Sequence, residues 1–391
     1  MSVLFEPIKI KNLELPNRFV RSATGDACSN SAGEVTEKHL QLFADLAAGG
    51  IGLIITGVIY VHPSGQISPT QLSLAGDDCI PGLKRLTRTV HDRGAKIAAQ
   101  LFHGGRESAP FFKETGRVPK GPSVIEYDPY FTEAYCALSG QEIGEIISAF
   151  GDAAARAREA GFDAVQLHGA HAYLLSQFLS PFTNRRDDEW GGTLEKRLRL
   201  HHEIYKDIRG KVGEDYPVII KTAVQDGFAG GLDFSEGKEA AKLLAQWGFD
   251  ALEISQGLRG KYFEETEFKS KINSLDREGY FRDWCREIKQ QVNVPVMMVG
   301  GLRSVGLMEE IVEKGEADFI SLCRPFIRQP GLVQEWKRGG RRRATCISCN
   351  ECLAAILKRQ NLRCVHEERE RLRSGFTGVT TQSSQILDKE A

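Results

Sequence analysis

Two histidines and a tyrosine lie close together in the middle of the chain, at His168, His171 and Tyr173. Two imidazole N–H groups can donate hydrogen bonds to one oxygen atom on which negative charge develops, and a phenol can supply a proton as a general acid. Side chains three positions apart on a straight strand face opposite ways, but a chain that leaves a strand into a turn can bring both rings to one side. The three residues are therefore candidate catalytic and substrate-binding groups for a substrate that carries an oxygen atom.

Other roles for these residues stay open at this point. One histidine of the pair can pack in the wall of the fold, and the tyrosine can be a packed ring whose hydroxyl is satisfied. Histidine is also a common metal ligand, although no carboxylate-rich motif accompanies the pair.

The composition is that of an ordinary globular protein, with 391 residues, 41% hydrophobic, 26% charged and a formal net charge of -1. This balance gives no electrostatic basis for binding nucleic acid or a membrane surface. The N-terminal segment has no basic stretch followed by a long apolar run, and no segment is apolar over the length of a spanning helix. The cysteines outside the C-terminal region are scattered along the chain, as is usual for reduced thiols. We therefore expect a cytoplasmic protein, and the charge balance and apolar pattern lead us to expect no nucleic-acid or membrane partner.

Short apolar runs rich in β-branched residues recur along the chain and indicate eight strands buried on both faces. They lie at Phe19–Gly25, Gly52–Val61, Lys96–His103, Asp163–His168, Pro217–Val224, Ala251–Gly257, Pro295–Gly301 and Asp318–Arg324. Helix-compatible stretches alternate with them, for example at Thr36–Ala48, Glu142–Ala160, Leu194–Val212, Ser235–Gln246 and Ser304–Glu313. Eight alternating units favour an α/β fold, a (β/α)8 TIM barrel, over an open sheet, and we expect it to occupy residues 1–340.

Active sites of such barrels collect at the carboxyl ends of the strands, where the fourth predicted strand ends in His168. Gln100 closes the apolar third strand, and its amide can both donate and accept hydrogen bonds. Lys221 lies within the apolar fifth strand, where a cation needs a counter-charge from a structural ion pair or from an anionic ligand. Both are candidate binding residues, the alternative for Gln100 being a solvated surface side chain.

The residues after the seventh and eighth predicted strands, Gly300–Gly301 and Cys323–Arg324, stand where these barrels bind phosphate. Glycines expose backbone N–H groups, and an arginine adds charge and two parallel donors. The alternative is a generic tight turn beside a surface arginine.

Two regions depart from the alternation of strand and helix. The connection Gly104–Gly140, after the third strand, is about twice as long as its counterparts, which is typical of a lid or binding loop. Residues 341–366 form a short Cys-rich extension that we expect to pack on the barrel. Residues 367–391 are polar and turn-prone without apolar periodicity, so we expect a mobile tail.

The extension contains four cysteines, Cys346, Cys349, Cys352 and Cys364. CxxCxxC followed by a fourth cysteine suits a [4Fe-4S] cluster, and four thiolates can also hold zinc. A third option is a remnant without any ligand. The quartet is therefore a candidate metal site.

The segment HGAHAYLLSQFLSPFTNRRDDEWGG, from His168 to Gly192, closely resembles the active-site segment of the old yellow enzyme family. Members of this family are NAD(P)H-dependent flavin oxidoreductases, or ene reductases. Further matches are LFEPIKIKNLELPNRFV near the start, QLFHGGR at Gln100–Arg106, VGG ending at Gly301, and CRPF, so the resemblance spans residues 3 to about 335. It is nearest to the barrel domain of the 2,4-dienoyl-CoA reductase branch, in which the third cysteine gap is usually one residue longer and FAD- and nucleotide-binding domains follow.

The resemblance implies an FMN cofactor held over the mouth of the barrel. The residues that it places against FMN are Ala23, Thr24, Gly25, Gly57, Val58, Gln100 and Lys221, with Gly300, Gly301, Cys323 and Arg324 at the phosphate. Two positions depart from the family pattern. Relatives often carry Thr or Cys in place of Gly25 and Arg in place of Lys221, which keeps the charge but loses the planar fork of donors.

The resemblance also implies a ping-pong reaction in which NADH or NADPH reduces the flavin and the flavin then reduces an enone-type small molecule. His168 and His171 would hold the substrate carbonyl oxygen, and Tyr173 would protonate the α-carbon. The alternatives are a flavin/Fe-S dehydrogenase or demethylase acting on an amine, and an electron-transfer subunit of a larger reductase. A homo-oligomer or an electron-transfer partner is compatible with the ene reductase and with these alternatives.

Overall fold

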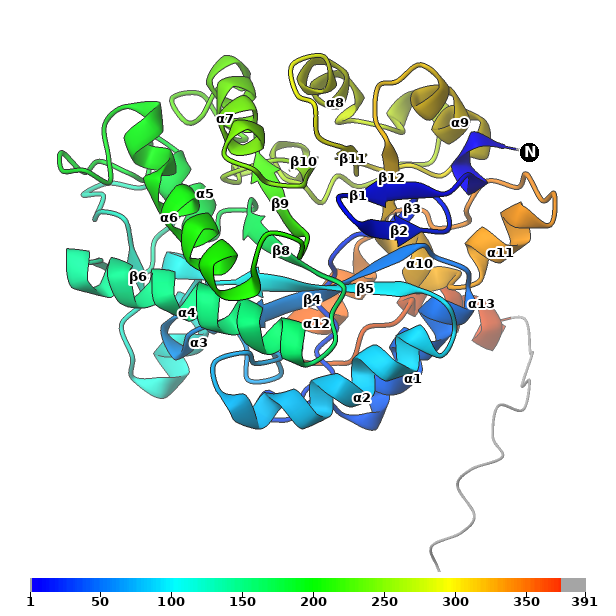
Figure 1. Cartoon of the computed structure of the whole chain (residues 1–391), viewed down its shortest axis with the longest axis horizontal. Coiled ribbons are helices and arrows are strands. Elements are labelled where there is room, and N and C mark those ends of the chain that lie inside the picture. The colour runs from blue at the N-terminus through cyan, green and yellow to red at the C-terminus, as the bar shows by residue number, and fades with distance from the viewer. Residues whose placement is uncertain (1, 374–391) are drawn as a thin grey trace, which may run out of the picture.

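The structure is a computed structural model that describes residues 2–373 (Figure 1). Eight parallel strands close into a barrel in the order β10-β11-β12-β3-β4-β5-β8-β9, so each strand neighbours the one before and after it in the barrel. Their bounds are β3 Phe19–Arg21, β4 Leu53–Tyr60, β5 Lys96–Phe102, β8 Ala164–Gly169, β9 Val218–Ala223, β10 Ala251–Ser255, β11 Val296–Met298 and β12 Phe319–Leu322. The predicted TIM barrel and all eight predicted strands are confirmed.

The first strand is shorter than the apolar run that predicted it. It ends at Arg21, and the backbone N–H of Ser22 still donates to the Leu322 carbonyl at 3.0 Å. Ala23, Thr24 and Gly25 then leave the ladder and line a cavity instead. The end of the run therefore serves a binding surface rather than the sheet.

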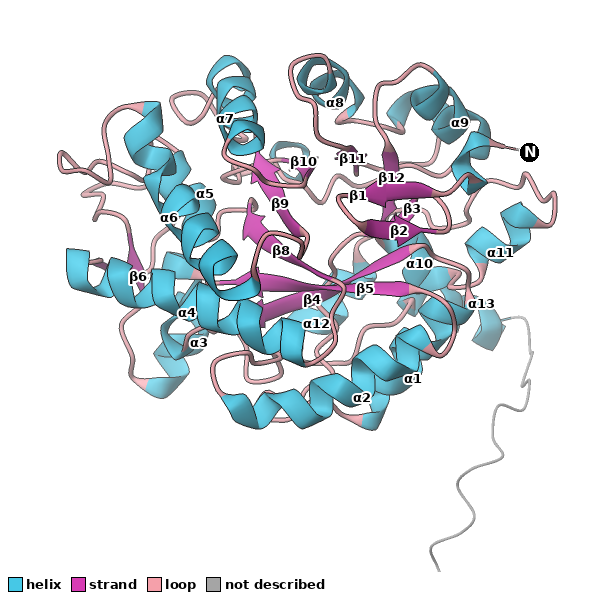
Figure 2. Ribbon diagram, in the orientation of Figure 1, coloured by secondary structure: helices cyan, strands magenta, loops and turns pink. Residues whose placement is uncertain are grey.

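Helices surround the barrel, as the cyan ribbons around the magenta strands show (Figure 2). The longer ones are α1 Glu37–Ala48, α2 Ile80–His91, α4 Gly140–Glu159, α6 Leu194–Val212, α7 Phe234–Gln246, α8 Arg282–Lys289 and α9 Val305–Glu313, with shorter helices α5 Leu174–Leu179, α10 Arg324–Arg328 and α11 Leu332–Lys337. The local chemistry explains their starts. Ser139 and Glu142 form a reciprocal capping box at α4, and the side chain of Asp233 accepts the Glu236 N–H at the start of α7.

The amino-terminal end of the barrel is closed by a hairpin of β1 Ile8–Ile10 and β2 Leu13–Leu15. Three of its side chains join one buried cluster with at least one apolar residue from each of the eight barrel strands. The cluster consists of Ile10, Leu13, Leu15, Val20, Leu53, Ile55, Ala98, Ala164, Ile219, Ala251, Met297 and Phe319. This apolar plug leaves only the opposite end of the barrel open.

The long connection after β5 has regular elements of its own. It contains a 3-10 turn at Gly105–Ser108, α3 Ala109–Thr115, β6 Lys120–Gly121 and β7 Cys136–Ala137. A buried ion pair, 2.5 Å from Arg106 Nη1 to Asp128 Oδ2, ties its first turn to its middle. The connection between β5 and α4 therefore has regular secondary structure and an internal ion pair.

The Cys-rich extension packs on the barrel and contains α12 Glu351–Leu357. Backbone N–H groups of Ala344 and Leu362 donate to the carbonyls of Arg303 and Asp26 at 3.0 and 2.8 Å. The first residues of the segment expected to be a mobile tail belong to a short helix, α13 Val365–Arg373. The helix buries no side chain, and it is stabilised by ion pairs near it in sequence, such as Glu367–Arg371, and by the pairs of Glu370 with Arg328 of α10 and of Arg369 with Glu351 of α12. Residues 374–391 lie outside the described residues.

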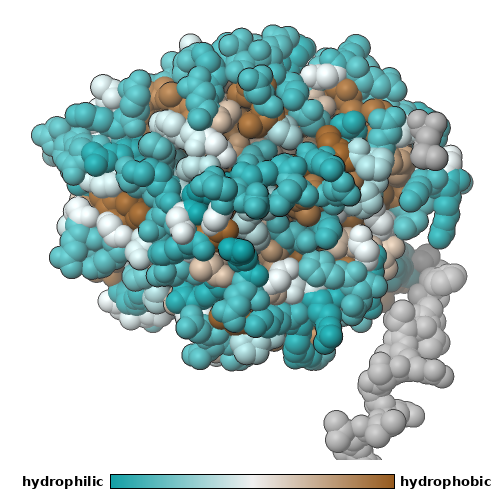
Figure 3. Space-filling view, viewed as in Figure 1, coloured by the Kyte–Doolittle hydropathy of each residue, from teal (hydrophilic) through white to brown (hydrophobic). Residues whose placement is uncertain are grey.

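The surface shown in Figure 3 is mainly hydrophilic, with hydrophobic residues in small separate patches. None of the helices within residues 2–373 is both long and apolar enough to cross a membrane.

The plug gives a direct test of the fold. Ile10 is fully buried, so Ile10→Ala should lower the free energy of unfolding by about 2–5 kcal/mol through lost burial and a cavity. Lys9 precedes it in the same strand with its side chain 62% exposed, and Lys9→Ala should change stability by less than about 1 kcal/mol. Denaturant unfolding of both variants measures this, and similar midpoints for the two would contradict the role of the plug.

Candidate active site

A cavity of about 300 Å³ opens at the carboxyl ends of the barrel strands. Every cofactor- or substrate-binding residue expected from the sequence lines it: Ala23, Thr24, Gly25, Gly57, Val58, Gln100, His168, His171, Tyr173, Lys221, Gly300, Gly301, Cys323 and Arg324. These residues are spread along the chain from Ala23 to Arg324, and only barrel closure brings them together. The extension completes one wall with residues such as Cys352, Leu353 and Ile356.

A row of polar side chains crosses the floor of this cavity. Gln100 Nε2 donates to Gln166 Oε1 at 2.8 Å, and Gln166 Nε2 donates to Glu253 Oε2 at 3.0 Å. Lys221 Nζ lies 3.3 Å from the same Glu253 oxygen and donates to Ser22 Oγ at 2.9 Å. Lys221 therefore has a structural counter-charge in Glu253, and it also lines the cavity, where it is available to an anionic ligand.

The register of the sheet explains this row. Glu253 of β10 stands opposite Lys221 of β9, and Gln100 of β5 stands opposite Gln166 of β8. Sequence reasoning missed Gln166 and Glu253. The signal that singled out Lys221, a polar side chain inside an apolar strand, is present at both positions in AVQLH and ALEIS.

Two acceptors in the row, Gln100 Oε1 and Glu253 Oε1, have no donor among the described residues. Gln100 Oε1 is buried and makes no hydrogen bond, although its amide nitrogen is bound to Gln166. A buried acceptor without a donor costs free energy, so this oxygen fits a ligand that brings an N–H group. The isoalloxazine edge of FMN carries such an N–H between two carbonyls, which suits Gln100 beside the Lys221 cation.

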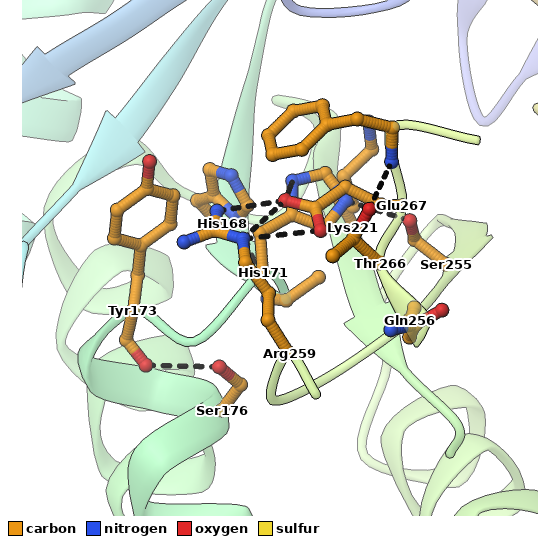
Figure 4. A network of polar contacts seen from close by, with 12 residues as sticks. His168, His171, Tyr173, Ser176, Lys221, Ser255, Gln256, Arg259, Thr266 and Glu267 are labelled. Carbon is orange, nitrogen blue, oxygen red and sulfur yellow. Dashed lines mark hydrogen bonds and ion pairs between the residues drawn. The ribbon is translucent and has the colours of Figure 1, made fainter. Parts of the chain in front are cut away.

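His168 lies near the end of β8, and His171 follows in the turn after the strand, with Tyr173 beyond it (Figure 4). His171 and Ala172 have φ of 60° and 65°, in the left-handed region that non-glycine residues rarely adopt. The His171 N–H is held by the Gln256 carbonyl at 3.0 Å. As a result the imidazole of His171 meets that of His168 with ring centroids 4.9 Å apart and planes at 81°, as the turn was expected to allow.

Both imidazoles are neutral. Burial, aided by nearby cations that include Lys221 and Arg259, lowers the pKa of His168 and of His171 well below 6.5. His168 Nδ1 accepts the Ala170 N–H at 3.3 Å, so its proton lies on Nε2. His168 can therefore donate one hydrogen bond from Nε2 to a ligand oxygen.

The contacts of His171 place its proton on the other nitrogen. Its Nε2 lies 2.7 Å from Ser255 Oγ, and its Nδ1 lies 3.8 Å from Glu267 Oε1. Because a carboxylate faces Nδ1, the neutral ring keeps its proton there and accepts the Ser255 hydroxyl at Nε2. The Nδ1–H group of His171 is thus a second donor at this end of the cavity.

Tyr173 packs by its edge against Phe102 and His168, with ring centroids 4.5 and 5.0 Å apart. Burial raises the pKa of its phenol above 10, with Arg259 opposing that shift. The phenol stays protonated at neutral pH and is able to act as a proton donor.

Arg259 and Glu267 are site residues for which the sequence carried no signal, because both lie in the connection between β10 and α8. Arg259 is paired with Glu267 at 2.7 Å, and its guanidinium carbon lies 5.5 Å from the centroid of the Tyr173 ring. They give the histidine end of the cavity a charged wall, which Figure 4 shows beside His171.

The far end of the cavity has the features of a phosphate site. Gly300 and Gly301 have φ of 135° and 76°, and a Cβ on Gly301 would lie 2.8 Å from the Tyr280 ring. Arg324 is held at this end by the Lys269 carbonyl at 2.9 Å and by Asn350 Oδ1 at 2.7 Å. Glycine backbone and an oriented guanidinium suit an FMN phosphate.

The four cysteines of the extension line a second, small cavity of about 20 Å³ beside Arg324 and Arg328. All four are free thiols. Within residues 2–373, no group of three or more His, Cys, Asp or Glu side chains is arranged to hold a metal ion. The four cysteines therefore line one cavity, but their thiols are not drawn together as a metal's coordination shell in this arrangement.

The lowered histidine pKa values can be checked in solution. The ring ¹⁵N shifts of His168 and His171 should remain those of neutral imidazole down to about pH 5.5, where a histidine with the ordinary pKa would be about nine-tenths protonated. The measurement is NMR of histidine-labelled protein, with signals assigned by His168→Gln and His171→Gln. A titration midpoint near 6.5 for either ring would contradict the effect of burial on that ring.

Comparison with known proteins adds an independent finding. Residues 3–342 match the model of the NADH:flavin oxidoreductase / NADH oxidase family. The chain is 36% identical to an NADH oxidase of Thermoanaerobacter brockii, covering 92% of this chain and 55% of that protein. It is 34% identical to a cinnamate reductase of Clostridium sporogenes, covering 90% of this chain and 56% of that protein.

Among solved structures, the chain resembles the old yellow enzyme homologue from Zymomonas mobilis, with a TM-score of 0.73 and 25% identity over 88% of this chain and 95% of that one. The chain spans only about half the length of the two curated relatives named above. The family match covers the whole barrel and the site residues that the barrel contributes, and it ends before the Cys-rich extension. The chain therefore belongs to the NADH:flavin oxidoreductase / NADH oxidase family, on an old yellow enzyme type of barrel.

Proposed function

We propose that this chain is an FMN-dependent oxidoreductase that uses NADH or NADPH to reduce the C=C bond of an α,β-unsaturated carbonyl compound by ping-pong hydride transfer. The observation that carries the proposal is the convergence of His168, His171 and Tyr173 at one end of the cavity. Two neutral imidazoles can donate hydrogen bonds to one ligand oxygen, and a protonated phenol lies beside them. Such groups can stabilise an enolate and protonate it.

Four sets of residues would hold FMN. The amide of Gln100 would take the N–H of the pyrimidine edge, and Lys221 would face the N1/C2 carbonyl region where negative charge accumulates on reduction. Gly57 offers a surface without a side chain, since a Cβ there would lie 2.7 Å from the Thr24 carbonyl. Gly300, Gly301 and Arg324 would bind the phosphate.

Bound FMN would supply hydride transfer from the nicotinamide to the alkene. The side chains of the protein bind the substrate oxygen and supply the proton. His168 Nε2–H and His171 Nδ1–H bind the substrate carbonyl oxygen and stabilise the charge that grows on it when the β-carbon accepts hydride. Tyr173 then gives its phenolic proton to the α-carbon, and the high pKa of this phenol keeps that proton available at neutral pH.

The experiment that tests the proposal separates its two halves. Oxidised protein is titrated anaerobically with NADH and with NADPH, and the reduced protein is then mixed with a panel of enones that includes cyclohexenone. Reoxidation of the flavin by an enone, with formation of the saturated ketone, is the expected result. Fast oxidation of the nicotinamide without alkene reduction would favour an electron-transfer subunit, and turnover of amines would favour a dehydrogenase or demethylase.

Tyr173 gives a sharper test of the mechanism. Tyr173→Phe should slow alkene reduction by roughly 10²–10⁴-fold, because the proton donor is lost, while reduction of the flavin by the nicotinamide changes little. Tyr127 lies in the loop after β5 and is 81% exposed, so Tyr127→Phe is a matched control that should not alter either half-reaction. Stopped-flow measurement of the two half-reactions decides the role, and equal alkene reduction in the wild type and Tyr173→Phe would exclude it.

We also propose that Cys346, Cys349, Cys352 and Cys364 bind a [4Fe-4S] cluster. The support is their CxxCxxC spacing and their shared cavity, with Arg324 and Arg328 beside it to offset thiolate charge. Ligation would have to draw the sulfur atoms together, since the thiols do not converge in this structure. No step of the proposed reaction depends on the cluster, which would pass electrons to or from a separate partner.

Metal analysis tests this second proposal. Protein purified anaerobically should contain iron and acid-labile sulfide in equal amounts, and Cys349→Ser should lose both. Cys136 is an exposed cysteine outside the extension, so Cys136→Ser should retain them. Zinc without sulfide would identify a structural zinc site instead, and absence of all three would mean that the quartet holds no ligand.

A further inference from the structure

A buried carboxylate that takes no part in the proposed reaction, Glu253, lies beneath the floor of the cavity. It is fully buried in β10 and is not among the residues that line the cavity. Its Oε2 atom lies 3.0 Å from Gln166 Nε2 and 3.3 Å from Lys221 Nζ, while its Oε1 atom has no donor among residues 2–373. Any effect of Glu253 on a ligand in the cavity therefore passes through these two neighbours.

The polar row that starts at Glu253 has a direction, because a carboxylate and an amide differ in what they can do. An ionised carboxylate only accepts hydrogen bonds, whereas an amide side chain both donates and accepts. Gln166 must therefore point its NH2 group at Glu253, which leaves its carbonyl oxygen to accept Gln100 Nε2 at 2.8 Å. As a result, the amide nitrogens of both glutamines point along the row toward Glu253.

This direction decides which atom Gln100 offers to a ligand. A glutamine without such a neighbour can exchange the places of its oxygen and nitrogen by rotation about its last bond, so it presents either an acceptor or a donor. Here the nitrogen is bound to Gln166, and Oε1 is the free polar atom of a side chain that lines the cavity. Gln100 is thereby fixed as a hydrogen-bond acceptor.

Lys221 supplies the complementary donor. Its ammonium group has three N–H bonds. Within the described part of the chain, two of them serve Ser22 Oγ, at 2.9 Å, and Glu253. The third remains for a ligand in the cavity that Lys221 lines. The floor thus offers an acceptor at Gln100 and a donor at Lys221, a pattern that recognises an imide edge, in which an N–H group stands next to a carbonyl.

We infer that Glu253 is a positioning residue for cofactor binding: its carboxylate sets the direction of the Gln166–Gln100 row, so the site selects a ring that carries an N–H group at this edge. This inference rests on the proposed binding of FMN, whose pyrimidine ring has such an N–H between two carbonyls. Glutamine in place of Glu253 removes the constraint, because a third amide can donate as well as accept. The row is then free to reverse, and Gln100 turns its NH2 group toward the N–H of the ligand.

The test compares FMN with 3-methyl-FMN, in which a methyl group replaces the hydrogen of that N–H. Dissociation constants are measured on flavin-free protein from the quenching of flavin fluorescence, so the readout does not involve turnover. The wild type should bind FMN roughly 10- to 100-fold more tightly than 3-methyl-FMN, because the methylated ring leaves the buried Gln100 acceptor without a donor. Glu253→Gln should lower this ratio about tenfold by weakening FMN binding. The lost charge beneath Lys221 acts on both ligands alike and cancels in the ratio.

Three further variants separate the direction of the row from a general loss of structure. Glu253→Asp keeps a carboxylate that only accepts, and it should retain most of the wild-type ratio. Gln166→Met fills a similar volume without an amide, so it should lower the ratio as Glu253→Gln does. Glu316 is a buried carboxylate paired with Arg282 outside the cavity, and Glu316→Gln should leave the ratio within about twofold of the wild type.

The outcomes distinguish this inference from the function on which it rests. FMN binding with the same ratio in the wild type, Glu253→Gln and Gln166→Met would overturn the inference and keep the proposed function. An equal fall of the ratio in Glu316→Gln would also overturn it, because the effect would then be one of general stability. A wild type that binds neither flavin would refute the proposed function itself. If Glu253→Gln does not fold, the contrast between Glu253→Asp and Gln166→Met decides the inference.

Discussion

The buried ion pair between Lys221 and Glu253 is the interaction around which the interior of the barrel is organised. A lone cation in this interior would cost several kcal/mol, so β9 can carry Lys221 only because the register places Glu253 opposite it. Gln166 and Gln100 extend the pair into a polar row across neighbouring strands. The hairpin plug makes the other end of the same interior apolar, which is why the cavity opens at one end only.

The turn after β8 depends on this arrangement. His168 stands opposite Lys221 in the register, and the nearby cation joins burial in keeping both imidazoles neutral. The left-handed backbone at His171 and Ala172 is a local cost that positions the second ring. The Lys221–Glu253 pair, the two neutral imidazoles and the protonated phenol of Tyr173 thus line the same part of the cavity. Arg259 and Glu267 add a charged wall to it.

Much of this was predictable from the sequence. The eight strands follow from apolar β-branched runs because a strand buried on both faces tolerates little else, and the site residues follow from their positions at strand ends and from the family resemblance. The exceptions have particular causes. Ala23, Thr24 and Gly25 leave the sheet because they line the cavity, and Val365–Arg373 is helical because ion pairs stabilise it without any buried face. Glu253 was not predicted as a site residue, although a charged residue inside the apolar run ALEIS is the same kind of signal as Lys221 in its strand.

The sequence by itself determined the class of fold, the family and the set of residues at the barrel mouth, because strand periodicity and motif order are properties of the chain in one dimension. The tertiary structure decided which side chains meet. The contacts of Lys221 with Ser22, of His171 with Ser255 and of Glu267 with His171 join residues far apart in the chain. Such contacts depend on barrel closure, strand register and the path of the β10–α8 connection, and neither composition nor spacing encodes these distances.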